Sequence, residues 1–152
     1  MLKRIFYCLL VILVAIPLWG TFNKSWDFLA TAVDCGASTT LVNGVGFTST
    51  QIEISRPQGM KDTGSLSVTF TRAAGSASTL DFEFQVSFDG GSSWSTAYYV
   101  RIRVATNETA LTNVVKVTKE LNLHGISHIR LYRIVNNDGA NAVTACNATL
   151  SL

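Results

Sequence analysis

The sequence predicts an all-β fold: a single β-sandwich, jelly-roll or immunoglobulin-like, of about eight strands after an N-terminal hydrophobic segment. Three observations predict it. From Thr48 onward apolar and polar residues alternate, turn-forming clusters separate the alternating runs, and no convincing amphipathic helix follows residue 30. Strict alternation indicates strands with one buried and one exposed face. The 152 residues suit an N-terminal segment over 1–22 and one domain over 23–152.

The strands are expected where the alternation is strongest. Their apolar positions are Ile52 and Ile54; Leu66, Val68 and Phe70; Leu80, Phe82, Phe84, Val86 and Phe88; Tyr98, Val100, Ile102 and Val104; Leu111, Val115, Val117, Leu121 and Leu123; Ile129 and Leu131; and Cys146, Ala148, Leu150 and Leu152. Segment 21–32 is ambiguous, since Trp26, Phe28 and Leu29 suit either a helical linker or a first strand. Strand order is non-local, so the topology of the sandwich stays open.

Turn-forming clusters fall between these runs, roughly every 10 to 18 residues. They occupy residues 56–59, 74–76, 89–91, 106–108, 124–125 and 136–139. This spacing is typical of sandwiches and differs from that of βαβ units. The chain has no internal repeat, which excludes solenoids and propellers.

The N-terminus predicts export. Lys3 and Arg4 precede an uncharged, mostly apolar stretch from Ile5 to Trp19. A basic start followed by such a stretch is typical of a secretory signal peptide, and it is short for a spanning helix, which needs about 20 apolar residues. Residues 1–22 are therefore expected to be a signal peptide, cleaved near Gly20, or an uncleaved membrane anchor. A buried core helix is the remaining alternative.

The charge balance restricts the partners. The formal net charge of +2 comes from Lys3 and Arg4, which leaves ten basic and ten acidic residues in the rest of the chain. A neutral domain argues against bulk attraction to nucleic acid. Its low charged fraction and many Ser, Thr, Asn and Gly residues give weak protection against self-association.

Two cysteines lie near the ends of the expected domain. Cys35 and Cys146 are candidates for a disulfide that ties the first strand to the last in an oxidising compartment. The alternative is two small thiols that are buried separately. Zinc is not expected, because neither cysteine has a second cysteine or histidine at ligand spacing.

The most specific local motif is the run from Ser87 to Trp94, Ser-Phe-Asp-Gly-Gly-Ser-Ser-Trp. It resembles the Asp-box, S-x-D-x-G-x-[ST]-W, of the bacterial neuraminidase repeats. The resemblance covers eight residues and implies a structural hairpin turn between strands 80–88 and 94–104. In it Asp89 would cap turn amides, Gly91 would take a positive φ and Trp94 would pack over the turn. It does not imply glycosidase activity, because there is one box and no propeller.

A wider stretch, residues 84–94 followed by residues 125–131, is similar in its general residue pattern and strand order to small β-sandwich modules of phage particle and tail proteins. That resemblance implies a structural role in a particle. It has no diagnostic motif. The exported leader departs from ordinary tail modules and better suits a virus with a lipid membrane, or a cell-surface protein.

An outward stripe of arginine and tyrosine forms the candidate interaction face. If the strands concerned are neighbours, the face joins two groups: Tyr99, Arg101 and Arg103, and Arg130, Tyr132 and Arg133. Arginine with tyrosine is common in protein interfaces and also binds acidic groups. The alternative is a solvated strand face whose arginines pair with Asp81 and Glu83 across the sheet.

No catalytic set is expected, and no cofactor or metal. His124 and His128 lie in one segment, without a serine or cysteine in the context of a nucleophile. Asp81 and Glu83 share a strand face, as a glycosidase pair would, but such acids usually serve surface solvation. The turn at 136–139 lacks the acidic density of a calcium site.

These observations predict a non-enzymatic structural or assembly protein, an exported or membrane-anchored subunit of a virion, surface layer or filament. Self-association or contact with other structural proteins is expected, with the membrane reached through residues 1–22. The alternative is a carbohydrate-binding or adhesive module that uses Trp94, Tyr98, Tyr99 and the arginines to bind a glycan.

Overall fold

The computed structural model describes residues 24–54, 62–72, 79–105 and 114–152. Ten strands lie in these ranges, and no helix does. The all-β prediction is therefore confirmed, with two strands more than expected. The predicted segment at 1–22 and the apolar position Leu111 lie outside the described residues.

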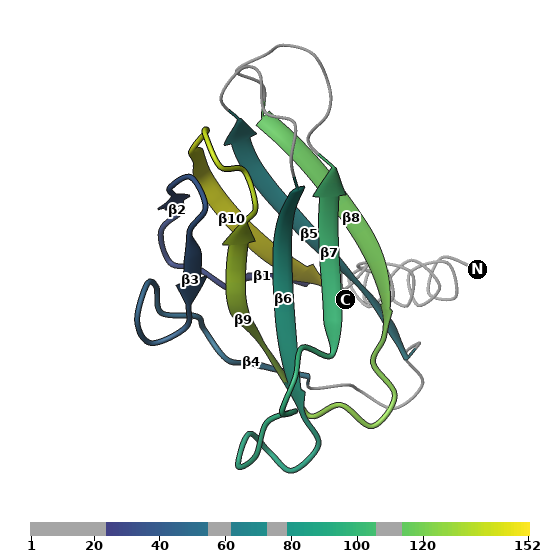
Figure 1. The fold of residues 1–152 in the computed structure, drawn as a ribbon. Coiled ribbons are helices and arrows are strands. Elements are labelled where there is room, and N and C mark those ends of the chain that lie inside the picture. Colours follow the sequence, from purple (N-terminus) through teal and green to yellow (C-terminus); the bar gives the residue numbers. More distant parts are fainter. Residues whose placement is uncertain (1–23, 55–61, 73–78, 106–113) are drawn as a thin grey trace, which may run out of the picture.

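Two antiparallel sheets pack face to face (Figure 1). The first, sheet A, has the order β1-β10-β5-β8, and β2 also pairs with β10. Its strands are β1 (Ser25–Asp27), β2 (Val33–Cys35), β5 (Thr63–Arg72), β8 (Val114–Asn122) and β10 (Val143–Ser151). The second, sheet B, has the order β3-β9-β6-β7, and β4 also pairs with β9. Its strands are β3 (Thr40–Val42), β4 (Ile52–Glu53), β6 (Thr79–Ser87), β7 (Val100–Ala105) and β9 (His128–Asn136).

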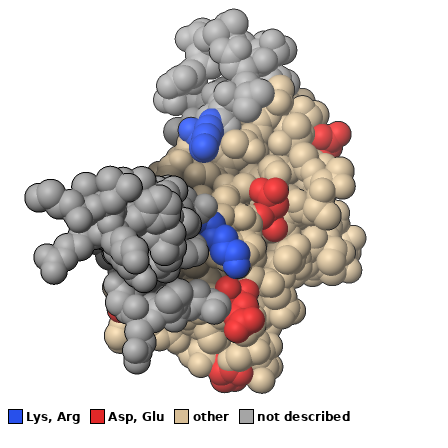
Figure 2. Space-filling view, turned by 180° about the vertical axis from the view of Figure 1, so that it is seen from behind, with Lys and Arg blue, Asp and Glu red and all other residues tan. Residues whose placement is uncertain are grey.

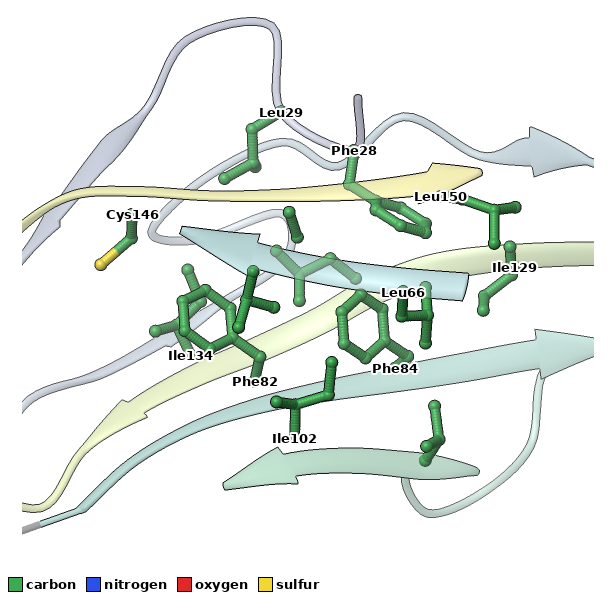
Figure 3. Close-up of a cluster of buried hydrophobic side chains, with 14 of the residues drawn as sticks. Phe28, Leu29, Leu66, Phe82, Phe84, Ile102, Ile129, Ile134, Cys146 and Leu150 are labelled. Atoms are coloured by element: carbon green, nitrogen blue, oxygen red, sulfur yellow. The ribbon is translucent and has the colours of Figure 1, made fainter. Parts of the chain in front are cut away.

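The core fills the space between the sheets. As predicted, the alternate apolar side chains of the long strands point into it. Figure 3 shows side chains from both sheets meeting there. Phe28 and Phe84 lie in this layer with their ring centroids 5.2 Å apart, and neither is exposed. Full burial of one such side chain contributes about 1.5–3 kcal/mol.

In segment 21–32 the sequence allowed a helix or a strand, and its described part, residues 24–32, forms an edge strand followed by side chains buried in the core. Residues 25–27 are β1, which pairs with β10, and Phe28 then turns into the core. The Phe28 amide donates to the Ala148 carbonyl at 2.9 Å, and its carbonyl accepts from the Thr50 amide at 2.7 Å. The strand interpretation was therefore right within the described part of this segment.

The hairpin after β6 differs from the prediction. The strand expected from Trp94 becomes regular only at Val100. The amides of Ser95 and Tyr99 still donate to Val86 and Phe84 of β6, at 3.0 and 2.7 Å, but residues 96–98 loop out between these two bonds. Phe88 and Tyr98, both expected at buried strand positions, are 60% and 38% exposed. The reason is that β6 ends at Ser87, where the turn begins, and that β7 begins only at Val100.

Candidate functional site

The candidate interaction face covers the outer surface of sheet B. We call it the arginine face and define it as Arg101, Arg103, Arg130 and Arg133 with Trp94, Tyr98, Tyr99 and Tyr132. Arg101 and Arg103 lie on β7, and Arg130 and Arg133 on β9. These strands are not neighbours, since β6 lies between them and pairs with both. The two predicted groups therefore share one face but flank a central strand.

The central strand β6 supplies the polar floor of the arginine face. The outward side chains Asp81, Glu83 and Gln85 are buried, with 3%, 1% and 5% exposure. The interpretation of Asp81 and Glu83 as surface solvation is therefore wrong. Long arginine side chains from β7 and β9 cover them, so β6 is buried on both of its faces.

Three of the arginines pair with these two carboxylates. Arg103 binds Asp81 through two hydrogen bonds, from Nε at 2.7 Å and from Nη2 at 2.8 Å. Arg101 donates to Glu83 Oε1 through Nη2 at 2.5 Å and Nε at 2.8 Å. Arg133 Nε donates to the other oxygen of Glu83, and this hydrogen bond raises the pKa of Arg133. The predicted cross-strand pairing with Asp81 and Glu83 is confirmed for these three side chains.

Arg130 differs from the other three. Its Nε and Nη2 donate to a neutral acceptor, Gln85 Oε1, at 3.1 and 2.7 Å, and its guanidinium lies 4.1 Å from the centre of the Trp94 ring. Gln85 is held in turn, because its Nε2 donates to the Ser95 carbonyl at 2.8 Å. Within the described ranges no carboxylate pairs with Arg130. Burial lowers the pKa of its guanidinium, as expected for an uncompensated cation.

Aromatic rings surround the arginines. The Arg101 guanidinium lies 4.1 Å from the centre of Tyr98, and that of Arg133 lies 5.6 Å from Tyr132. Tyr99 packs edge-on against Phe88 with centroids 6.3 Å apart. Phe88, Tyr98 and Tyr99 are 60%, 38% and 47% exposed, three of the four large hydrophobic side chains that are exposed in the described residues. Sequence reasoning missed Phe88. Its position directly before Asp89-Gly90-Gly91 was the signal that the strand ends there.

The turn from Ser87 to Trp94 is held by its own side chains. Asp89 accepts three hydrogen bonds: from the Ser93 amide at 2.9 Å, from Ser93 Oγ at 2.6 Å and from Ser87 Oγ at 2.7 Å. Gly91 has a φ of +86° and donates its amide to Ser87 Oγ at 2.9 Å. Trp94 lies against Arg130, so its contact joins the turn to the arginine face. The assignment of this turn to the Asp-box family stays a prediction.

Replacing Asp89 with Asn is expected to lower the melting temperature at pH 7. The hydrogen bonds from Ser93 and Ser87 hold the pKa of Asp89 well below its usual range. A carboxyl group whose pKa is lower in the folded chain than in the unfolded chain stabilises the fold when the pH is above its unfolded pKa, which is about 3.9 for Asp. This contribution is lost as the pH falls from there toward the lower pKa of the folded chain. The difference in melting temperature between wild type and Asp89→Asn should therefore shrink from about pH 5 downward. Glu53→Gln, at an exposed carboxylate on β4, is the control. A difference that is constant with pH would contradict this role.

The two domain cysteines lie close together at one end of sheet A. Cys35 ends β2, Cys146 lies on β10, and these two strands pair directly. Both carry free thiols and are fully buried in the structure. Burial raises the pKa of Cys35, and it raises that of Cys146 to about 12 with further contributions from Cys35 and Asp34.

Because thiolate is the reactive form, alkylation of Cys35 and Cys146 by iodoacetamide is expected to be at least about 100-fold slower in the folded chain than in denaturant. Peptide mass spectrometry of each cysteine measures this. Labelling of the folded chain at the unfolded rate would contradict the burial. Alkylation in denaturant without a reductant modifies every free thiol of the unfolded chain. If neither Cys35 nor Cys146 is modified under these conditions, the predicted disulfide is present.

The remaining polar candidates lie apart from one another. His124 Nδ1 lies 3.0 Å from Asp62 Oδ2 on the surface, whereas His128 Nδ1 is buried without a hydrogen-bond partner among the described residues. In the turn after β9, Asp138 Oδ1 accepts from the amides of Ala140 and Asn141 at 2.9 and 3.0 Å.

In the part of the chain that the structure describes, no group of three His, Cys, Asp or Glu side chains could hold a metal ion. Nor does any helix there have the length and apolar character to cross a membrane.

No protein-family model matches the chain, and no curated protein matches it. Among solved structures, a chain in the structure of infectious bursal disease virus, Gt strain, is similar with a TM-score of 0.50 and 12% identity, over 87% of this chain and 33% of that one. A chain of the infectious bursal disease virus VP2 subviral particle has a TM-score of 0.44 and 13% identity, over 85% of this chain and 32% of that one. The chain thus spans about a third of the length of these structures. The first likeness concerns the fold alone.

Proposed function

We propose that the chain is a non-enzymatic structural subunit of an ordered assembly, such as a virion, a surface layer or a filament. The observation that carries this proposal is the arginine face, which places Trp94, three tyrosines and four arginines on one sheet surface. Tryptophan, tyrosine and arginine dominate the binding energy of protein interfaces. Because three of the four guanidinium groups already lie on aromatic rings, these side chains lose little conformational freedom when a partner docks.

The fold supports the same proposal. A similar sandwich occurs in the structure of a virus, and this architecture presents two broad sheet faces to neighbours. The near-neutral domain adds to this, since copies of it approach one another without strong long-range repulsion.

Catalysis finds no support in the described geometry. Asp81 and Glu83, the one pair of carboxylates on a shared strand face that the sequence offered, are buried under arginines that neutralise them. A glycosidase pair needs one protonated acid and access for a sugar between the two groups. We therefore propose no enzymatic role.

Export and attachment remain part of the proposal and rest on the sequence. Residues 1–22 would act as a signal peptide or a membrane anchor, which would place residues 23–152 outside the membrane of the cell or on a virion. The intact mass of the mature chain tests this directly, since cleavage near Gly20 removes the mass of the leader.

The alternative function is a carbohydrate-binding or adhesive module. The exposure of Tyr98 and Tyr99 favours it. Against it, guanidinium groups lie over one face of Trp94 and of Tyr98, where a sugar ring would stack. A glycan array with wild type and the double variant Tyr99→Ala, Arg101→Ala separates the two functions. Only the alternative predicts specific glycan retention that the double variant loses.

The experiment for the proposed function is sedimentation velocity of the full-length chain, extracted in mild detergent, over a wide range of concentrations. Chemical cross-linking in intact membranes before extraction provides the native reference. We expect discrete oligomers or larger ordered species in both. A strict monomer at every concentration, with no cross-linked species in the membranes, would contradict the structural role.

A further inference from the structure

Arg130 is the one arginine of the arginine face that has no carboxylate partner among the described residues. Arg101, Arg103 and Arg133 each have a carboxylate partner, whereas Arg130 is half-buried and donates only to the neutral oxygen of Gln85. The four guanidinium groups therefore share two buried carboxylates, and Glu53, exposed on β4 opposite His128, forms no ion pair with any of them among the described residues. A partly desolvated cation without a counter-charge is costly, and an anion that binds beside it recovers that cost.

The position of Arg130 suits a planar anion. Trp94 supports one face of the guanidinium at 4.1 Å, and Gln85, itself held by the Ser95 carbonyl, fixes the Nε and Nη2 edge. In the part of the chain that the structure describes, Nη1 makes no hydrogen bond. The guanidinium is thus preorganised, with donors still available for the oxygen atoms of one carboxylate.

The chain itself carries exposed carboxylates that this site cannot reach within one molecule. Glu120 lies opposite Ser65, and Asp27 lies opposite Thr149, so both face outward from sheet A, on the far side of the sandwich from Arg130. Neither forms an ion pair with the described residues. Figure 2, which views the molecule from behind, shows a few acidic and basic groups, some of them next to one another, on a surface that is mostly uncharged. A contact that brings one of these carboxylates to Arg130 must join two molecules.

We propose that Arg130 binds a carboxylate, from Asp27 or Glu120, of a second copy of this chain. The inference rests on the proposed assembly role and specifies its contact. The outer face of sheet B in one copy meets the outer face of sheet A in the next, so the contact joins unlike surfaces. A contact of this kind is heterologous and propagates into a ring, filament or layer. Trp94 and the exposed Tyr98, Tyr99 and Phe88 supply the apolar area around the ion pair.

The test is a double-mutant cycle on the self-association of the full-length chain in detergent, followed by sedimentation velocity. Arg130→Gln is expected to raise the dissociation constant about 10- to 100-fold, the range for a charge-assisted hydrogen bond at an interface. Asp27→Asn or Glu120→Gln, whichever supplies the carboxylate, should weaken association by a similar factor, and combining it with Arg130→Gln should add little. Arg130→Lys keeps the charge but lacks the planar fork, and it should fall between wild type and Arg130→Gln.

The outcomes are distinguishable. If wild type associates and Arg130→Gln associates equally well, this inference is wrong and the assembly role stands. If wild type is monomeric, the assembly role itself fails. If Arg130→Gln weakens association but neither acidic variant does, the proposed pairing of Arg130 with Asp27 or Glu120 is wrong. If the Arg130-dependent ligand is instead a sialylated glycan on the array, the carboxylate does not come from a second copy. An unchanged melting temperature of Arg130→Gln controls for loss of the fold.

Discussion

Replacing Phe84 with alanine is expected to lower the free energy of unfolding by about 3–5 kcal/mol, the range for truncating a buried phenylalanine. Phe84 lies on the central strand β6, is fully buried and packs against Phe28 of the opposite layer (Figure 3). The cavity would open between two sheets whose ladders hold the backbone in place, so the site cannot collapse to fill it. Equilibrium unfolding in urea measures the loss.

The matched control for Phe84→Ala is Val45→Ala. Val45 is 92% exposed, and its truncation should change stability by less than about 0.5 kcal/mol. A loss below about 1 kcal/mol for Phe84→Ala would mean that the two sheets do not share one close-packed core. The paired-sheet fold would then be wrong.

Replacing Glu83 with alanine is the second large effect, expected at about 3 kcal/mol. Glu83 is 1% exposed, and its two carboxylate oxygens accept from Arg101 on one side and Arg133 on the other. Its removal leaves two cations without their shared partner on a crowded face. The value lies at the lower end of the range for a broken buried pair, because the arginine side chains are 28% and 35% exposed and regain some water.

Two variants control this result. Glu83→Gln keeps the shape of the side chain and one acceptor oxygen while removing the charge, and it should lose less stability than Glu83→Ala. Glu53→Ala removes an exposed carboxylate from β4 and should be nearly neutral. Equal stability of Glu83→Ala and Glu53→Ala in urea would show that Glu83 does not organise the arginine face.

The long strands were readable from the sequence because their alternation is uninterrupted. In the runs from Leu80 to Val86 and from Leu66 to Phe70, every apolar side chain that was expected in the core is buried. The strands β1, β2 and β3 have only three residues each, too few for a period of two to stand out. In β10 the pairing register shifts between Thr144 and Asn147, where Ala145 has a φ of +52°. Such an irregularity depends on the partner strand and leaves no local signal.

The composition of the arginine face was predictable, but its arrangement was not. The residue types and their outward parity follow from the sequence, whereas the order β9-β6-β7 is set by contacts far apart in the chain. Without that order, Asp81 and Glu83 look like solvated surface acids, and Arg130 looks like the other three arginines. Only the register of Gln85 with Arg130 singles Arg130 out.

The central claim is that the arginine face is buried between subunits when the chain assembles. Hydroxyl-radical footprinting of the full-length chain, with assembled and dissociated samples compared by peptide mass spectrometry, tests it most directly. We predict that oxidation of Phe88, Tyr98 and Tyr99 falls several-fold on assembly while that of Val45 does not change. Equal oxidation of these aromatic residues in both states would contradict the account.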